Sequence, residues 1–107
     1  MSHTIATFAA HLRALITARA VQMLLPLDRG AADRYTRQDA TFRREFPGIH
    51  WYSGRLDAIV NEHAAVWAST GRTGAIRRAK RDASERRSRD SVLATMTPAN
   101  DRSRVAS

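Results

Sequence analysis

The chain has 107 residues and a formal net charge of +8, from 18 basic and 10 acidic side chains. All but one of the basic residues are arginine, since Lys80 is the only lysine. This length fits one small domain, with or without a tail, and excludes most multi-domain enzymes. Because the chain has no cysteine, disulfides, thiolate zinc sites and cysteine nucleophiles are also excluded.

Apolar and charged residues are divided unevenly along the chain. All seven aromatic residues lie between Phe8 and Trp67. Residues 1–70 carry eight arginines and six acids, whereas residues 71–107 carry ten basic groups and four acids. The last third therefore cannot bury much on its own, because apolar burial must offset roughly 1–2 kcal/mol of backbone entropy per ordered residue. For so small a domain we expect a partner or self-association.

The first helix is predicted over residues 4–25, and Pro26 ends it. Two arginines, Arg13 and Arg19, interrupt its apolar residues, which argues against a membrane span. An acid-free amphipathic start is also typical of a mitochondrial transit peptide, but we expect a cytoplasmic protein. The apolar residues at helical spacing are Ile5, Phe8, Leu12, Leu15, Ile16 and Met23.

A turn at residues 28–30 is predicted to precede the second helix, over residues 31–45. Pro47 and Gly48 end it. Oppositely charged residues four apart on its solvent side are expected to pair, each pair contributing a few tenths of a kcal/mol. These pairs are Asp33 with Arg37 and Asp39 with Arg43.

The third helix, predicted over residues 53–69, has the strongest periodic signal in the chain. Its apolar stripe comprises Leu56, Ile59, Val60, His63, Val66 and Trp67. The stripe predicts that Val60 and Trp67 are buried and that His63 is a core histidine. Gly71 is the expected C-cap.

A glycine-rich hinge, residues 70–74, leads to a fourth helix predicted over residues 75–96. One side of this helix has no acid and carries cations and hydroxyls that suit phosphate contacts, with Arg72 at the hinge assisting. The predicted nucleic-acid-binding residues are therefore Arg72, Arg77, Lys80, Arg81, Ser84, Arg87 and Ser88.

The alternative interpretation is a solvated helix held by its own ion pairs, and the sequence does not decide between the two. Four pairs have the required spacing: Arg81–Glu85, Asp82–Arg86, Glu85–Arg89 and Arg86–Asp90. The hinge could also hold an anion at a helix start, although a plain connector is favoured. No heptad of leucines follows the basic residues, so the chain is not assigned to the leucine-zipper proteins, and no family resemblance is identified.

Catalytic and metal chemistry find no support in the sequence. The four histidines lack the spacing that places two ligands on one helical face, so no metal site and no cofactor are expected. No nucleophile elbow is present around Ser53. Trp51 and Tyr52 lie in a connector, where they are candidates for an interface as much as for core packing.

The sequence thus predicts an all-α fold, with a small three-helix core, a fourth, Arg-rich helix and a short disordered C-terminal tail. The expected divisions are a core domain over 1–70, a hinge and basic helix over 71–96, and a flexible tail over 97–107. The leading hypothesis is a non-enzymatic module that binds nucleic acid or a nucleoprotein. The alternative is a small assembly protein, for example a subunit of a complex, a mobile-element inhibitor or a virion component, which binds an acidic protein surface or forms a homo-oligomer.

Overall fold

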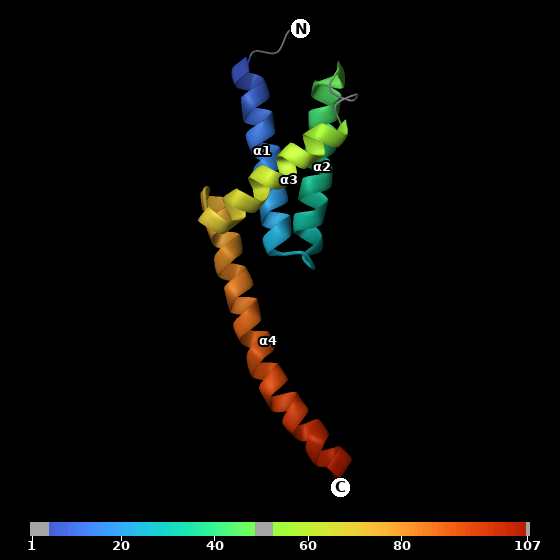
Figure 1. Cartoon of the computed structure of the whole chain (residues 1–107), viewed down its shortest axis with the longest axis vertical. Coiled ribbons are helices and arrows are strands. Elements are labelled where there is room, and N and C mark those ends of the chain that lie inside the picture. Colours follow the sequence, from blue (N-terminus) through green and yellow to red (C-terminus); the bar gives the residue numbers. More distant parts are fainter. Residues whose placement is uncertain (1–4, 49–52, 107) are drawn as a thin grey trace.

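The structure, a computed structural model, describes residues 5–48 and 53–106 of the chain. They form four helices, α1 (Ile5–Leu24), α2 (Arg29–Glu45), α3 (Ser53–Thr70) and α4 (Gly74–Ala106). The described residues contain no strand, so the predicted all-α fold is confirmed. Figure 1 shows α1 and α2 side by side, α3 crossing α1, and α4 projecting away from the other helices. The molecule is elongated, with principal extents of 71 × 25 × 20 Å.

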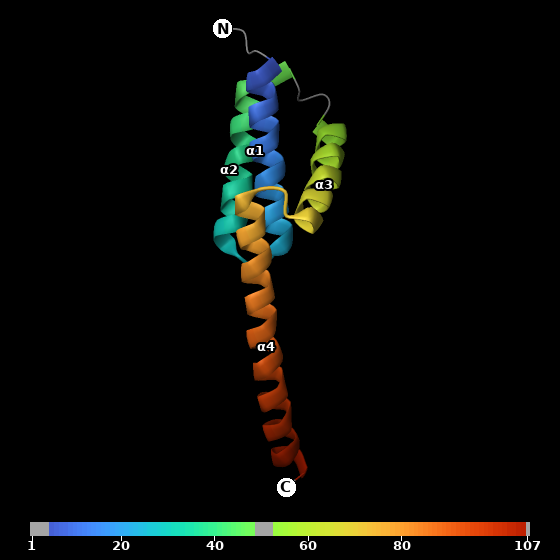
Figure 2. The ribbon, with the colours of Figure 1, turned by 90° about the vertical axis from the view of Figure 1, so that its left-hand side faces the viewer.

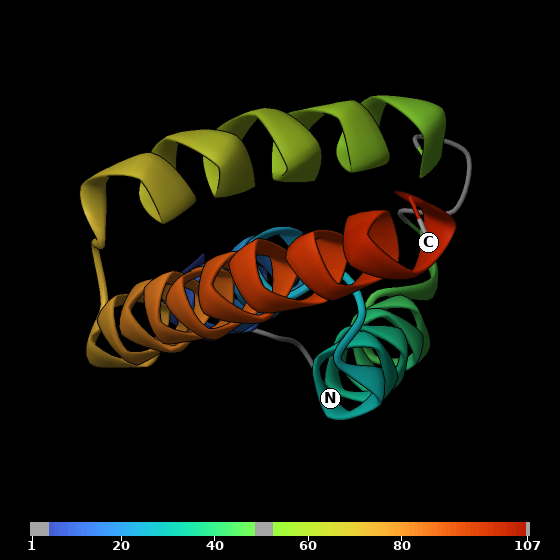
Figure 3. The same cartoon turned by 90° about the horizontal axis from the view of Figure 1, so that it is seen from below.

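Helix α1 is the centre of the fold, because α2, α3 and the start of α4 all pack against it. A helix that is apolar on nearly all sides is best satisfied by neighbours on several sides. The buried residues of α1 accordingly lie around its circumference: Leu15, Ile16, Ala18, Ala20 and Val21. Viewed from below, α3 and α2 lie on opposite sides of α4, with α1 behind it (Figure 3).

Helix α2 begins at Arg29, two residues earlier than predicted, so the expected turn at residues 28–30 is wrong for Arg29 and Gly30. The reason is a capping bond: the Asp28 carboxylate accepts a hydrogen bond of 3.1 Å from the backbone N–H of Ala31. Such an N-cap satisfies one of the unpaired donors of the first turn. The end of α2 at Glu45 agrees with the prediction.

The aromatic part of the core lies between the start of α1 and the end of α2. Phe42 is fully buried, and the Phe8 ring meets it edge-on at 5.6 Å between ring centroids. Phe46 packs against both rings at 5.1 Å. Aromatic pairs favour such edge-to-face geometry. Phe42 therefore ties α2 to α1.

The buried face of α3 differs from the predicted stripe. Its buried residues recur every four positions: Leu56, Val60, Ala64 and Ala68. Such a row forms one ridge that packs into the grooves of a crossing helix, and the two alanines permit a close approach to α1. The predicted core histidine, His63, is exposed, as are Ile59 and Val66. Val60 is buried as predicted, whereas Trp67 is only partly buried.

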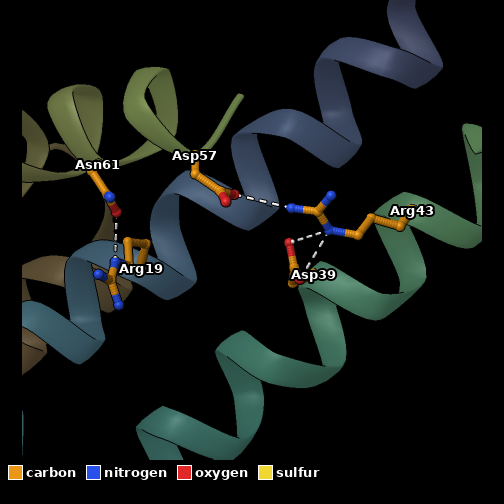
Figure 4. A network of polar contacts seen from close by, with 5 residues as sticks. All are labelled: Arg19, Asp39, Arg43, Asp57 and Asn61. Atoms are coloured by element: carbon orange, nitrogen blue, oxygen red, sulfur yellow. Dashed lines mark hydrogen bonds and ion pairs between the residues drawn. The ribbon is translucent and has the colours of Figure 1, made fainter. Parts of the chain in front are cut away.

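Polar contacts join the helices beside this core (Figure 4). Arg19 of α1 donates a 2.8 Å hydrogen bond to Asn61 of α3. Arg43 of α2 pairs with Asp39, four residues earlier, at 3.2 Å, and with Asp57 of α3 at 3.0 Å. The hydrogen bond to Asp39 raises the pKa of Arg43. The predicted pairing of Asp39 with Arg43 is thus confirmed, and Arg43 also links α2 to α3.

The start of helix α4 packs against the other helices through its alanine stripe, and the rest of the helix projects away from them. Ile76, Ala79 and Ala83 are buried against the other helices, so the core extends past residue 70. From residue 84 to residue 95 every side chain is exposed. This part of α4 projects away from the other helices (Figure 2). The helix continues to Ala106 instead of ending at Met96, because Pro98 removes one backbone donor without ending the helix. The flexibility of residues 97–107 in solution stays a prediction.

Candidate polyanion-binding helix

The turn between α3 and α4 is built around Gly71. Its φ of +66° lies in the left-handed region that favours glycine. The N–H groups of Gly71 and Arg72 both donate to the carbonyl oxygen of Trp67, at 2.9 and 3.3 Å. These bonds satisfy an otherwise unpaired carbonyl at the end of α3, which confirms the predicted C-cap.

Thr73 sets the start of α4. Its hydroxyl accepts a hydrogen bond of 3.2 Å from the N–H of Ile76, and its carbonyl accepts one of 2.9 Å from Arg77. These are the bonds of an N-cap residue. One of the donors that an anion would need is therefore already occupied, which favours a connector at this turn.

Two of the predicted phosphate-binding residues reach back to the end of α3. Arg77 Nη1 donates to the Gly71 carbonyl at 3.2 Å, and Lys80 Nζ donates to the Ser69 carbonyl at 2.7 Å. Cations near the C-terminus of a helix are stabilised by its dipole and by its unpaired carbonyls. Arg77 and Lys80 thus link the start of α4 to the end of α3, while both side chains remain exposed.

Arg72 is placed differently from the other predicted site residues. Its guanidinium carbon lies 4.9 Å from the ring centroid of Trp67. A cation over an indole face is attracted by the ring quadrupole. Arg72 therefore lies over the Trp67 ring at the end of α3.

The remaining predicted site residues lie on α4 beyond the capped turn. Arg81, Ser84, Arg87 and Ser88 are all exposed. Arg87 also lines a hollow of about 380 Å³ with residues of the α1–α2 link, so its side of the helix faces the body. Neither Arg81 nor Arg87 forms an ion pair with any residue that the structure describes.

The four ion pairs predicted along α4 do not form among the described residues. Arg86 instead pairs with Asp28, the N-cap of α2, at 3.1 Å. The N–H of Ala31, and next the Arg86 guanidinium, hold the pKa of Asp28 below its usual value. The sequence missed this contact because its two residues are 58 positions apart.

Trp51 and Tyr52, the predicted interface residues, lie outside the described residues. Across residues 5–48 and 53–106, no three histidine or acidic side chains are grouped so that they could hold a metal ion. Among the helices described, none is both long enough and apolar enough to cross a membrane.

Comparison of the chain with protein-family models, with curated proteins and with solved structures gave no match.

Proposed function

We propose that the chain is a cytoplasmic, non-enzymatic module that binds a polyanion, most directly nucleic acid, through the projecting part of α4. The observation that carries this proposal is a set of exposed cations without ion-pair partners. Three exposed arginines of α4, Arg81, Arg87 and Arg89, have no carboxylate within ion-pair distance among the described residues. If ion pairs along α4 stabilised this helix, those pairs would have neutralised these arginines.

The binding mechanism follows from the side chains. Arginine offers two parallel N–H donors to a phosphate, and a serine hydroxyl offers a neutral donor to the same group. Arg81 and Arg87 neutralise phosphates and release their counterions, and Ser84 and Ser88 supply the neutral donors. Contacts of this kind position a nucleic acid without reading its bases, so binding is expected to be independent of sequence.

Paired variants test this assignment. Arg81→Gln with Arg87→Gln removes two unpaired cations from α4, whereas Arg37→Gln with Arg55→Gln removes the same charge from exposed positions on α2 and α3. Fluorescence anisotropy with a labelled random single strand at low salt compares them. We expect the α4 pair to weaken binding by about tenfold or more and the control pair by much less. Equal losses in both pairs, or no binding by the wild type, would overturn the proposal.

The capping residues need a separate variant, because they also hold α4 in place. Arg77→Gln with Lys80→Gln removes two donors to the end of α3. We expect this variant to lower the melting temperature, which the Arg81 and Arg87 changes should leave nearly unaltered. Binding loss in the capping variant is therefore interpreted only after its stability is measured.

Exposed apolar side chains favour protein assembly as the second candidate function. Leu27 is 97% exposed, and Val92 and Leu93 on the projecting part of α4 are each 59% exposed. Contiguous apolar residues left open on a surface are typical of contact sites, and Val92 and Leu93 are consecutive. Sedimentation analysis of wild type and of Val92→Ser with Leu93→Ser tests this candidate: it requires an oligomer that the double variant dissociates.

A further inference from the structure

A groove runs along the seam between α1 and α2, above the point where α4 begins. It has a volume of about 470 Å³. Figure 2 shows that α4 starts beside the C-terminal part of α1, which leaves the N-terminal part of the seam without a covering helix on this side. We call this hollow the α1–α2 groove, and its main residues are Ala10, Arg13, Ala14, Ala18, Val21 and Arg34.

The floor of the α1–α2 groove is made of small apolar side chains of α1. Ala10, Ala14, Ala18 and Val21 follow one another at steps of three or four residues, so they share one face of the helix. From Ala10 to Val21 this face is about 16 Å long, which corresponds to roughly three helical turns. Small side chains permit the close approach of another helix, so the floor has the dimensions of a helix-docking surface.

The walls of the groove are positively charged. Arg13 of α1 and Arg34 of α2 are exposed, and neither has an ion pair with a described residue. No aspartate or glutamate lines the groove, whose other polar residues are threonines and Gln38. Thr73 and Ala75 close one end, so the positive N-terminal end of the α4 dipole lies there.

From this arrangement we infer that the α1–α2 groove binds an amphipathic helix of an acidic partner protein. The small apolar residues of the partner helix pack on the alanine floor, and the carboxylates that flank them pair with Arg13 and Arg34. The arginine-rich α4 of a second copy does not fit, because its cations would be repelled by Arg13 and Arg34. A nucleic-acid strand does not fit either, because phosphates gain nothing from the apolar floor. The inference is independent of the function proposed for α4.

A synthetic helix is the probe. It has about 18 residues, with alanine and leucine on one stripe and glutamate on both flanks, and a fluorescent label. A peptide of the same composition with the stripe scrambled is its control. Arg13→Glu with Arg34→Glu reverses the walls, and Arg37→Glu with Arg55→Glu is the matched charge control. Ala14→Leu fills the floor, and Ala65→Leu is its control on the exposed side of α3.

We expect the wild type to bind the striped peptide at least tenfold more tightly than the scrambled one. The wall reversal and Ala14→Leu should each lower that affinity by about tenfold or more, while their two controls change it less than about threefold. If circular dichroism shows that the variant with Arg13→Glu and Arg34→Glu does not fold, the affinity of the Ala14→Leu variant decides the test. The Arg81 and Arg87 double variant should bind the peptide normally, which separates this inference from the function proposed for α4.

Three results would overturn the inference: no binding of the striped peptide, equal binding of both peptides, or equal losses in a variant and its control. The groove would be a nucleic-acid site instead if the wall reversal abolished binding of a labelled single strand while the wild type ignored the striped peptide.

Discussion

Replacing Ile76 by alanine should destabilise the whole fold, although this residue belongs to the helix that carries the basic surface. Its side chain is completely buried, next to Ala79 and Ala83, which are too small to fill the space that it would leave. A buried isoleucine cut to alanine typically costs about 2–5 kcal/mol, from lost apolar burial and from the cavity. For a domain of this size, each kcal/mol corresponds to roughly 4–8 °C in melting temperature.

Thermal unfolding followed by circular dichroism measures this cost. Val92→Ala is the matched control, because Val92 is a β-branched residue of the same helix that is 59% exposed. It should shift the melting temperature by only a few degrees. If Ile76→Ala does not fold, the milder Ile76→Val should still cost about 0.5–1.5 kcal/mol. Equal melting temperatures for Ile76→Ala and the wild type would refute the packing of α4 against α1.

Four further outcomes follow from the structure. Truncation after Thr97 should leave the melting temperature unchanged, and a large fall would show that the removed residues pack. Gly71→Ala should cost about 1–2 kcal/mol in a denaturant titration, because alanine disfavours the φ of +66°, and an unaltered midpoint would contradict this. Trp67→Ala should cost less than the about 3–5 kcal/mol of a buried aromatic, and unchanged stability with lost binding would make Trp67 an interface residue. The folded pKa of Asp28 is lowered, so its stabilising effect is fully present above its unfolded pKa and is lost as pH falls through the folded pKa. Asp28→Asn should therefore flatten the decline in melting temperature below about pH 4, and an unchanged decline would contradict this.

The helices of this protein were predictable because their signals are local. Apolar spacing, Pro26 and Gly71 place the ends of α1 and α3 within a residue or two of their positions in the structure. The sequence predicts the start of the second helix two residues too late, because the arginine and glycine after Asp28 are typical of a turn. Only the capping bond from Ala31 shows that Asp28 begins a helix.

The orientation of α3 could not be predicted from side-chain size. Ile59 and Val66 are large and apolar, yet they are exposed, while Ala64 and Ala68 are buried. The small residues lie on the buried face of α3, whose main packing partner is α1, and the face that is buried depends on how the two helices cross. Periodicity identifies a helix, but it does not reveal which neighbour will require a small residue.

The candidate site was predicted in part. The sequence places exposed cations on one side of α4, but not the link from Lys80 to the Ser69 carbonyl, which depends on the geometry of the intervening turn. The α1–α2 groove was also missed. The spacing of Ala10, Ala14 and Ala18 could have indicated a close-packing face, but only the position of α4 shows that this face is left uncovered.

The salt dependence of nucleic-acid binding tests the proposed role of α4 most directly. The affinity of the wild type for a labelled random duplex is measured from about 50 to 200 mM salt, together with that of the Arg81→Gln, Arg87→Gln variant. The logarithm of the affinity should fall linearly with the logarithm of the salt concentration. The slope for the variant should be smaller by about 2, close to one unit for each lost phosphate contact. No binding by the wild type at the lowest salt, or identical slopes for the two proteins, would contradict the account.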